Sequence, residues 1–323
     1  MEISPQNQSS KVVATKISVV IPLYNKVDYI GRCIDSVLNQ TTGTGEIIVI
    51  DDGSSDGSAD FVEQHYKNKV TLIRQSNGGA SVARNTGIDN SKFDFIALLD
   101  GDDEWHPCFL EEICQLILEN PGCDIFATAY KLVYPNQQRD PKYSDLTKRF
   151  RGKITNYFRS SMSDWSVLSS SSTAIRKSLL IDVGKFKPGL SLGEDTDLWC
   201  RLALKSNIAF FNKPLALYYC LNDSSITKSN IPSEELECSK KLTLALFNNE
   251  VPQEMRHDAK RYIAKGLQYL IREHAKRGNY SVLAKFLLDK RIYYYFGLST
   301  IKMLLAILIP GKTYEYLKNL RIK

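Results

Sequence analysis

Residues 16–24, KISVVIPLY, form a continuous apolar and β-branched run, which is typical of a strand buried on both faces of a sheet. The helical spacing of apolar residues from Ile30 to Leu38 predicts a helix next. The alternation continues with a strand EIIVI at 46–50, a helix from about 58, a strand VTLIR at 70–74, a helix from about 80 and a strand FIALL at 95–99. This order predicts an α/β fold with right-handed βαβ units and a mainly parallel, Rossmann-like sheet covered by helices on both faces.

Polar residues directly follow three of these buried strands. Tyr24 comes after the first strand, Asp52 after the second and Asp100 after the fourth. Ligands of open α/β sheets bind at the carboxyl ends of the strands. We therefore expect these three residues to line one crevice.

Beyond Leu118 the pattern becomes mixed. A strand is expected near Ile125–Tyr130, a loop over Pro135–Lys153, and a strand-like segment with two helices between 170 and 204. From about Ser233 the sequence is helical. The expected organisation is a flexible leader over 1–15, a catalytic domain over 16–228 and a helical C-terminal region over 229–323.

The net charge of +6 is unevenly distributed along the chain. From Val251 to Lys323 there are 15 Lys and Arg against 5 Asp and Glu, so this part carries +10 and the preceding part is net acidic. An acidic part suits metal and sugar chemistry, whereas a basic tail suits anionic lipid or nucleic acid. The polar N-terminus has no apolar segment long enough for a signal peptide, so a cytoplasmic protein is expected.

The turn DDGSSDGS at 51–58 follows a strand and opens a helix. In one interpretation its aspartates only satisfy amides at the helix end. In the other, a carboxylate accepts the imide N–H of a uracil or thymine base. The motif alone does not decide between the two interpretations.

The turn DGDD at 100–103 places three carboxylates within four residues, where they repel one another. Mn²⁺ and Mg²⁺ prefer oxygen ligands, commonly one or two carboxylates together with phosphate oxygens. We therefore expect a divalent cation that bridges the diphosphate of a donor. A solvent-exposed turn without a cation is the alternative.

Two further motifs allow both a structural and a chemical interpretation. Gly78 and Gly79 lead into a helix with Arg84, which is either a flexible turn with a surface arginine or a set of backbone amides and a cation for a nucleotide. Glu194 and Asp195 open another helix, where the helix dipole alone accounts for acids. A sugar hydroxyl is a poor nucleophile, so a carboxylate there can also serve as the general base that takes its proton.

Five segments in this order, VVIPLYN, VIDDGSSDGS, NGGASVARNTGI, LLDGDDEWHP and GEDTDLWCRL, resemble the inverting glycosyltransferase family 2 of polysaccharide biosynthesis, which has the GT-A fold. The resemblance covers about residues 16–227. It implies a metal-dependent, hexosyltransferase-type enzyme that uses Mn²⁺ or Mg²⁺. Such an enzyme moves a sugar from a nucleotide-diphosphate sugar, here a UDP-sugar, to a hydroxyl of a glycan or lipid-linked acceptor.

The resemblance also implies which residues bind the donor nucleotide. Pro22 and Tyr24 resemble the segment that packs against the base and ribose. Asp52 matches the residue that reads the base, and Arg84 matches a basic residue near the nucleotide.

The same resemblance assigns the reacting end of the site. Asp100 and Gly101 belong to the donor-binding part of the D-x-D motif, and Asp102 matches its direct metal ligand. Asp195 matches the catalytic base. One departure is Asn222, which stands where many members of the family have a histidine.

The apolar segment 292–309 is interrupted by Lys302 and followed by a basic tail. A lysine at the centre of a spanning helix costs about 2.5–3.5 kcal/mol, so a position in the membrane interface is favoured over spanning. A buried helix is the alternative. The expected partner is an anionic membrane surface and not nucleic acid, with the protein peripheral at the inner face of the cell membrane.

Two other classes of function compete with the glycosyltransferase. One is a catalytically silent nucleotide-sugar-binding or scaffold protein at a membrane assembly, against which Asp102 and Asp195 argue. The other is a sugar nucleotidyltransferase, which is disfavoured because the first strand ends in Pro22-Leu23-Tyr24 and not in a glycine-rich loop. The dinucleotide fingerprint G-x-G-x-x-G and the P-loop motif are also absent from the sequence.

Overall fold

The computed structural model describes residues 16–163, 165–190, 192–220 and 231–295. Its strands are β1 (Ile17–Leu23), β2 (Glu46–Asp51), β3 (Thr71–Arg74), β4 (Phe95–Leu98), β5 (Glu104–Trp105), β6 (Ile125–Tyr134), β7 (Gln137–Arg139), β8 (Arg151–Ile154), β9 (Thr173–Arg176) and β10 (Ile208–Tyr219). Its helices are α1 (Val27–Leu38), α2 (Ser58–Tyr66), α3 (Ala80–Asn90), α4 (Phe109–Glu119), α5 (Tyr157–Ser160), α6 (Lys177–Asp182), α7 (Glu194–Ala203), α9 (Glu237–Phe247), α10 (Gln253–Lys276), α11 (Tyr280–Leu287) and the 3₁₀ helix η1 (Lys290–Tyr295). The expected alternation of strands and helices up to residue 99 is confirmed.

The strands form one sheet in the order β3-β2-β1-β4-β9-β6-β10-β5, with β7 beside β6 and β8 beside β10. The first four strands of this order are mutually parallel, as the βαβ pattern predicts. β9 is antiparallel to both of its neighbours, and β6 and β10 are parallel to each other. The α/β class is therefore confirmed, with a parallel first half and a mixed second half.

Two stretches differ from the sequence-based expectation. Residues 135–153 are not only a loop, because β7 pairs with β6 and β8 pairs with β10. The residues of β7 are all polar and exposed, so no apolar alternation marks this strand. β10 is absent from the prediction, because Pro214 interrupts its apolar run and coincides with two shifts in its register against β6.

Alternate residues of β1 face two different hydrophobic cores. Val19 and Ile21 pack in a core that includes residues of α1, α2 and α4. Val20 packs in the other core with residues of α3, α6 and α7. Because strand side chains alternate between the two faces of a sheet, the helices must cover both faces, as expected.

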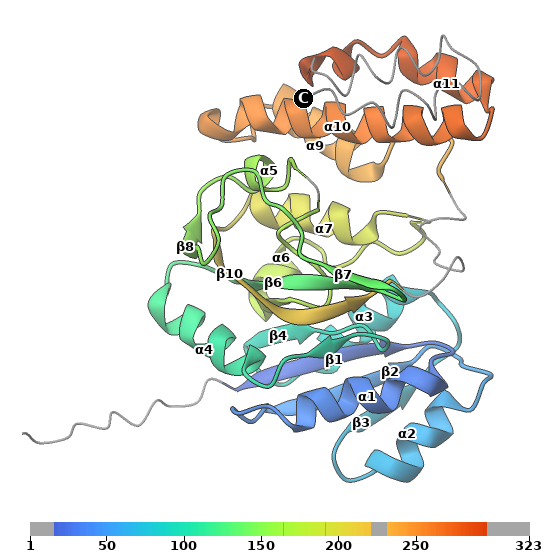
Figure 1. Cartoon of the computed structure of the whole chain (residues 1–323), viewed down its shortest axis with the longest axis vertical. Coiled ribbons are helices and arrows are strands. Elements are labelled where there is room, and N and C mark those ends of the chain that lie inside the picture. Colours follow the sequence, from blue (N-terminus) through green and yellow to red (C-terminus); the bar gives the residue numbers. More distant parts are fainter. Residues whose placement is uncertain (1–15, 164, 191, 221–230, 296–323) are drawn as a thin grey trace, which may run out of the picture.

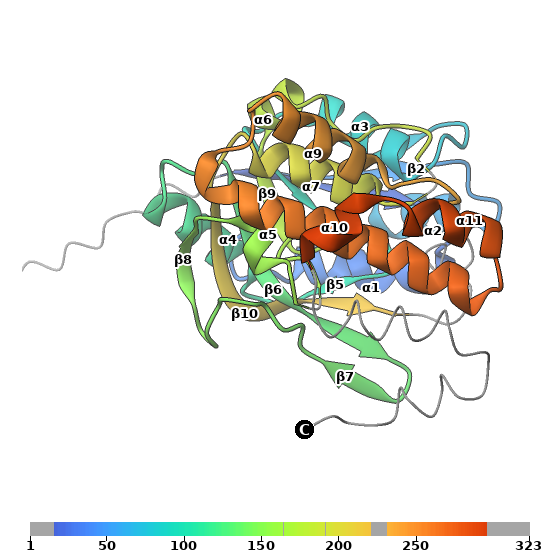
Figure 2. The same cartoon turned by 90° about the horizontal axis from the view of Figure 1, so that it is seen from above.

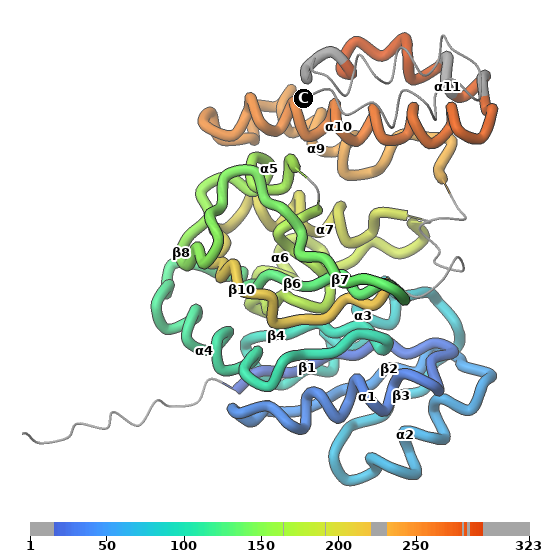
Figure 3. The backbone as a smooth tube through the Cα atoms, in the orientation of Figure 1, coloured from blue at the N-terminus to red at the C-terminus, as the bar shows by residue number. Residues whose placement is uncertain are grey.

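The C-terminal helices form a further layer over α5 and α7, at the top of Figure 1. Leu242 of α9 and Ile263 of α10 belong to the same core as Trp199 of α7. Seen from above, α10 runs across the molecule (Figure 2), and in Figure 1 α11 lies above α10 and α9 below it. The chain reaches this layer only after β10, as the tube in Figure 3 shows. The expected helical C-terminal region is therefore present and packs on the rest of the chain.

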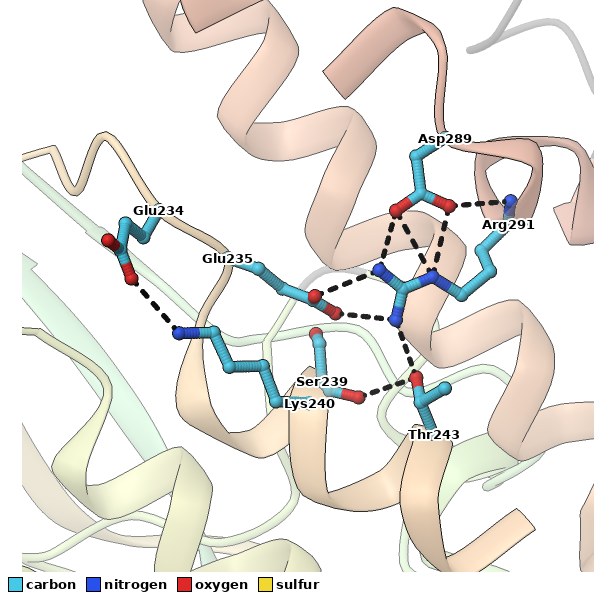
Figure 4. A network of polar contacts seen from close by, with 7 residues as sticks. All are labelled: Glu234, Glu235, Ser239, Lys240, Thr243, Asp289 and Arg291. Atoms are coloured by element: carbon cyan, nitrogen blue, oxygen red, sulfur yellow. Dashed lines mark hydrogen bonds and ion pairs between the residues drawn. The ribbon is translucent and has the colours of Figure 1, made fainter. Parts of the chain in front are cut away.

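Two polar networks accompany this packing. Asp258 of α10 is buried and accepts hydrogen bonds from Asn156 Nδ2 and Arg159 Nε, each at 2.9 Å. Arg291 of η1 donates to both carboxylate oxygens of Glu235, at 2.9 and 2.8 Å, and to Thr243 Oγ1 of α9 at 2.7 Å (Figure 4). These contacts tie α10 to α5 and η1 to α9.

Several sequence-based expectations fall outside the described residues. They concern the leader over 1–15, Asn222, the domain boundary at 228 and most of the apolar segment 292–309. The domain bounds stay a prediction. Within the described ranges, no helix is both long enough and apolar enough to cross a membrane.

Candidate active site

The register of the parallel strands brings the predicted residues to one edge of the sheet. Leu23 pairs with Asp51, so Tyr24 and Asp52 follow two strands that end side by side. Tyr24 is 49% exposed, whereas Asp52 is only 2% exposed. A Cβ atom added to Gly101 would lie 3.0 Å from the carbonyl oxygen of Pro22, so the turn after β4 passes close to the end of β1. The strand ends therefore bring these residues close together at one edge of the sheet, and the crevice that they are expected to line stays a prediction.

The turn after β2 holds the start of α1. Ser58 Oγ accepts the backbone N–H of Lys26 at 2.9 Å, and Asp56 Oδ2 accepts the backbone N–H of Val27 at 3.1 Å. Burial alone would raise the pKa of Asp56, but hydrogen bonds from Ser58 and Val27 outweigh it and lower this pKa. The structural interpretation of this turn, aspartates that satisfy helix-end amides, therefore applies to Asp56.

Asp52 has a different set of partners. Its Oδ1 accepts from Gln75 Nε2 at 2.7 Å and from the backbone N–H of Gly78 at 2.9 Å, while its Oδ2 accepts from the backbone N–H of Gly79 at 2.7 Å. The two amides that the sequence suggested as ligand donors are thus used within the chain. An ionised carboxylate has about four acceptor positions, so about one remains for a ligand.

The three carboxylates of the turn after β4 point to three different partners. Asp100 Oδ1 accepts from Arg84 Nη2 at 2.6 Å, and Asp102 Oδ2 lies 2.5 Å from Lys26 Nζ. Asp103 is buried and accepts from Ser171 Oγ and from the backbone N–H of Tyr219. The turn is therefore not an ordinary solvent-exposed one. The repulsion among its three carboxylates is relieved because each carboxylate has its own partner.

Burial and repulsion still act on the innermost of these carboxyls. Asp103 loses its hydration by burial and lies close to the negative charges of Asp102 and Asp100, which together raise its pKa well above the usual range. Its hydrogen bonds from Ser171 and Tyr219 oppose this shift only in part. Asp103 therefore belongs to the interior, and Asp100 and Asp102 remain as the partly exposed pair.

Arg84 contacts both the turn after β4 and the start of α7, where the predicted base Asp195 lies. The residue is only 5% exposed, which excludes a surface arginine, and its guanidinium carbon lies 5.1 Å from the centre of the Phe186 ring. Besides Asp100, its Nη1 lies 3.6 Å from Glu194 Oε1 at the start of α7. Burial alone would lower the pKa of Arg84, but Asp100 and Glu194 outweigh it and raise this pKa.

Asp195 lies in the first turn of α7, next to Glu194. Its Oδ1 accepts from the backbone N–H of Thr196 at 2.6 Å and from Thr196 Oγ1 at 3.2 Å. Burial and the charge of Asp195 raise the pKa of Glu194, while Arg84 lowers it. Of the two acids, Glu194 is the one that pairs with Arg84, and Asp195 has no ion pair within the described residues.

The residues at this edge fit a divalent cation only together with donor phosphates. No group of three or more His, Cys, Asp or Glu in the described part of the chain is arranged to hold a metal ion. The carboxylate of Asp102 already contacts a positive charge, because it forms an ion pair with the ammonium group of Lys26. Mg²⁺ commonly uses one or two carboxylates and completes its shell with phosphate oxygens and water, which matches the partly exposed Asp100 and Asp102.

Sequence reasoning missed two side chains of the site. Lys26 is the partner of Asp102, and Glu194 is the second partner of Arg84. Lys26 stands two residues after Tyr24 at the end of β1, so the rule that selected Tyr24 also places Lys26 at the same edge. Glu194 precedes the predicted base directly, but nothing in its spacing indicates an arginine partner.

Comparison with known proteins agrees with this fold. The model of the family described as "Glycosyl transferase family 2" matches residues 18–184, which is more than half of the chain. The chain therefore belongs to glycosyltransferase family 2, as its five motifs indicate.

Relatives and solved structures extend the comparison. Glycosyltransferase AglE of Haloferax volcanii is 31% identical over 192 residues, 58% of this chain and 60% of AglE. TuaG, a Bacillus subtilis glycosyltransferase named for teichuronic acid biosynthesis, is 35% identical over 120 residues, 36% of this chain and 47% of TuaG. The chain spans less than two thirds of the length of the curated relatives it matches.

Among solved structures, residues 1–349 of Staphylococcus aureus TarS, crystallised with UDP-GlcNAc, match with a TM-score of 0.63 and 20% identity. The match covers 91% of this chain and 79% of the TarS chain. At this identity the likeness shows the fold alone. The GT-A fold predicted from the sequence is thus confirmed.

Proposed function

We propose that the protein is an inverting glycosyltransferase of hexosyltransferase type that moves a sugar from a UDP-sugar to a hydroxyl of a glycan acceptor in cell-surface polysaccharide synthesis. The observation that carries this proposal is the buried Arg84, which contacts Asp100 of the D-x-D turn and Glu194 beside Asp195. One side chain thereby fixes the distance between the donor-binding turn and the turn of the base. Such positioning of two reactants is a large part of catalysis by group-transfer enzymes.

In the proposed reaction Asp195 acts as the general base. An acceptor hydroxyl oxygen forms a bond to the anomeric carbon while the bond from that carbon to the diphosphate oxygen breaks. The hydroxyl proton passes to the carboxylate of Asp195, and the nucleoside diphosphate leaves with the electron pair of the broken bond. Because the attack is a single in-line displacement, the anomeric configuration is inverted.

Asp102, with Asp100 beside it, would hold Mn²⁺ or Mg²⁺ together with the donor phosphates. When bound, the cation supplies positive charge that stabilises the leaving diphosphate. The support is the pair of partly exposed carboxylates and the cation that already lies on Asp102. Arg84 keeps the main-chain turn in place by binding Asp100, so that the partly exposed carboxylate of Asp102 stays at the edge of the sheet.

Pro22, Tyr24, Asp52 and Gly101 would form the subsite for the nucleoside. Tyr24 offers an exposed ring at the end of β1, and Asp52 has about one acceptor position left for an imide N–H. TarS, which shares the fold, has been crystallised with UDP-GlcNAc, and this supports a uridine nucleotide as donor.

The proposed acceptor is lipid-linked, and the proposed location is peripheral at the cytoplasmic face of the membrane. Support comes from the +10 charge after Val251 and from the apolar segment 292–309 with its basic tail. Binding to liposomes should increase with anionic lipid and decrease at high salt without vanishing, because an apolar face stays inserted. Removal of 296–323, which keeps Arg291 with its contacts to Glu235 and the buried Ile292, should release the protein from liposomes, and binding that persists after this truncation would contradict the proposal.

The experiment that tests the proposed activity is a screen of nucleotide sugars with Mn²⁺, first by thermal shift and then for release of nucleoside diphosphate. We expect a UDP-sugar to stabilise the protein and to be hydrolysed slowly without an acceptor. Binding without any turnover, with or without glycan acceptors, would favour a silent binding protein. Release of pyrophosphate from a sugar phosphate and a nucleoside triphosphate would indicate a nucleotidyltransferase.

A further inference from the structure

Two cations of the α1 region contact the turn at 100–103, in different ways. Arg32 Nη2 donates to the main-chain carbonyl of Asp102 at 2.7 Å, and its guanidinium lies 3.8 Å from the centre of the Tyr219 ring. Lys26 instead places its ammonium on the carboxylate of Asp102. Arg32 therefore holds the backbone of the turn, while Lys26 occupies the group proposed to bind metal.

The backbone of Lys26 is fixed, whereas its side chain is partly exposed. Its N–H is bound by Ser58 Oγ, and the next N–H is bound by Asp56. The side chain is 35% exposed, and its ammonium lies 5.9 Å from the centre of the Tyr29 ring. A lysine ammonium on a four-carbon stem can change partner without moving the main chain.

A divalent cation and the ammonium of Lys26 compete for the same carboxylate. If both bound Asp102 together, a divalent cation and the ammonium of Lys26 would lie side by side on one carboxylate and repel each other strongly at such a short distance. Departure of Lys26 therefore favours binding of the metal. The diphosphate of a donor is the nearest new source of negative charge for the released ammonium, since lysine binds phosphate well as a point charge.

We propose that Lys26 is an exchangeable counter-ion of Asp102, which neutralises this carboxylate before the donor binds and then moves to the donor diphosphate as the metal takes its place. The inference rests on the proposed function, because it assumes that Asp102 is the metal ligand. It assigns Lys26 as a positioning residue. The exchange makes binding of metal and donor mutually favourable, because each ligand removes an obstacle to the other.

The test measures Mn²⁺ binding by calorimetry on the full chain, with and without UDP. Lys26→Met keeps the apolar stem but removes the charge, so without UDP we expect it to bind Mn²⁺ about fivefold more tightly than the wild type, the size of one partly exposed ion pair. Lys26→Arg keeps the charge and should behave like the wild type. Lys213→Met, which removes a lysine paired with Glu112 on the α4 side, is the matched control and should leave Mn²⁺ affinity unchanged.

Addition of UDP should strengthen Mn²⁺ binding by a larger factor in the wild type than in Lys26→Met. Without metal, Lys26→Met should bind UDP about fivefold more weakly than the wild type. Thermal melting verifies that the variants are folded.

Asp102→Ala separates failure of this inference from failure of the proposed metal site. If Asp102→Ala abolishes Mn²⁺ binding while Lys26→Met binds Mn²⁺ no more tightly than the wild type, the exchange is wrong and the metal site stands. If Asp102→Ala binds Mn²⁺ like the wild type, both the metal site and the exchange are wrong.

Discussion

The acidic turns after β2 and β4 lie at the same edge of the sheet but are satisfied in different ways. Asp52, after β2, is held by two backbone amides and one glutamine of its own half of the chain. Asp100 and Asp102, after β4, are held by the cationic side chains of Arg84 and Lys26. Backbone amides leave only when the loop moves, whereas a lysine leaves by rotating its side chain.

This difference distinguishes aspartates that hold the backbone from aspartates that are proposed to bind a ligand. The turn after β2 is part of the scaffold, since Ser54, Ser58 and Asp56 also bind backbone amides at the start of α1. The turn after β4 presents carboxylates whose charge is balanced by side-chain cations, of which the partly exposed Lys26 is the one proposed to be exchangeable. A cluster of aspartates therefore indicates a ligand site more strongly when its partners are side-chain cations than when they are backbone amides.

The largest effect on transfer is expected for Asp195, the predicted base, which lies in neither of these two turns. Asp195→Asn should reduce transfer by at least roughly 10²-fold with nearly unchanged donor affinity, because a general base contributes to the transition state and not to binding. The measurement is transfer kinetics together with calorimetric donor binding. Asp182→Asn, the same change at an exposed position at the end of α6, should have no effect. Near-wild-type turnover of folded Asp195→Asn would remove Asp195 from the mechanism.

The next effect tests the turn after β4. Asp102→Ala should weaken donor binding by roughly 10- to 100-fold when Mn²⁺ is present, because it removes a metal ligand, and should change it little in EDTA. Stability should stay close to the wild type, since the lost partner is a partly exposed lysine. Asp140→Ala, at an exposed carboxylate after β7, serves as the control. Equal donor affinity of the wild type in Mn²⁺ and in EDTA would argue against any metal at this turn.

The strands and the positions of the acidic turns could be predicted from the sequence, but the partners of the carboxylates in these turns could not. The buried strands β1, β2 and β4 are marked by local apolar runs, and the strand-end rule then places Tyr24, Asp52 and Asp100 at one edge. The partners are set by side chains from distant parts of the chain, such as Lys26 and Asp102, which are 76 residues apart. Spacing carries no signal for such pairs. β10 was missed for a different reason, because Pro214 breaks its local pattern.

A smaller effect, on stability, tests the turn after β2. Asp52→Ala removes the acceptor of the backbone amides of Gly78 and Gly79, and a hydrogen bond to a charged group contributes about 1.5–3 kcal/mol to stability. We expect the free energy of unfolding to fall by about 2 kcal/mol in urea denaturation. Asp60→Ala, at an exposed carboxylate of α2, should change it by less than about 0.5 kcal/mol. If Asp52→Ala is as stable as the control, Asp52 does not stabilise the loop at 75–79.

The smallest effect concerns the one acceptor position that Asp52 has left. A uracil or thymine base presents a single imide N–H, which one acceptor satisfies, whereas guanine presents an N–H and an adjacent amino group that require two. One unmatched hydrogen bond is worth about 1 kcal/mol, so UDP and dTDP should bind about fivefold more tightly than GDP in competition titrations. The same ranking at lower overall affinity is expected for Asp102→Ala, because that change affects the diphosphate and leaves the base subsite intact. Tighter binding of GDP than of UDP would show that Asp52 serves the loop at 75–79 alone and that the base is recognised elsewhere.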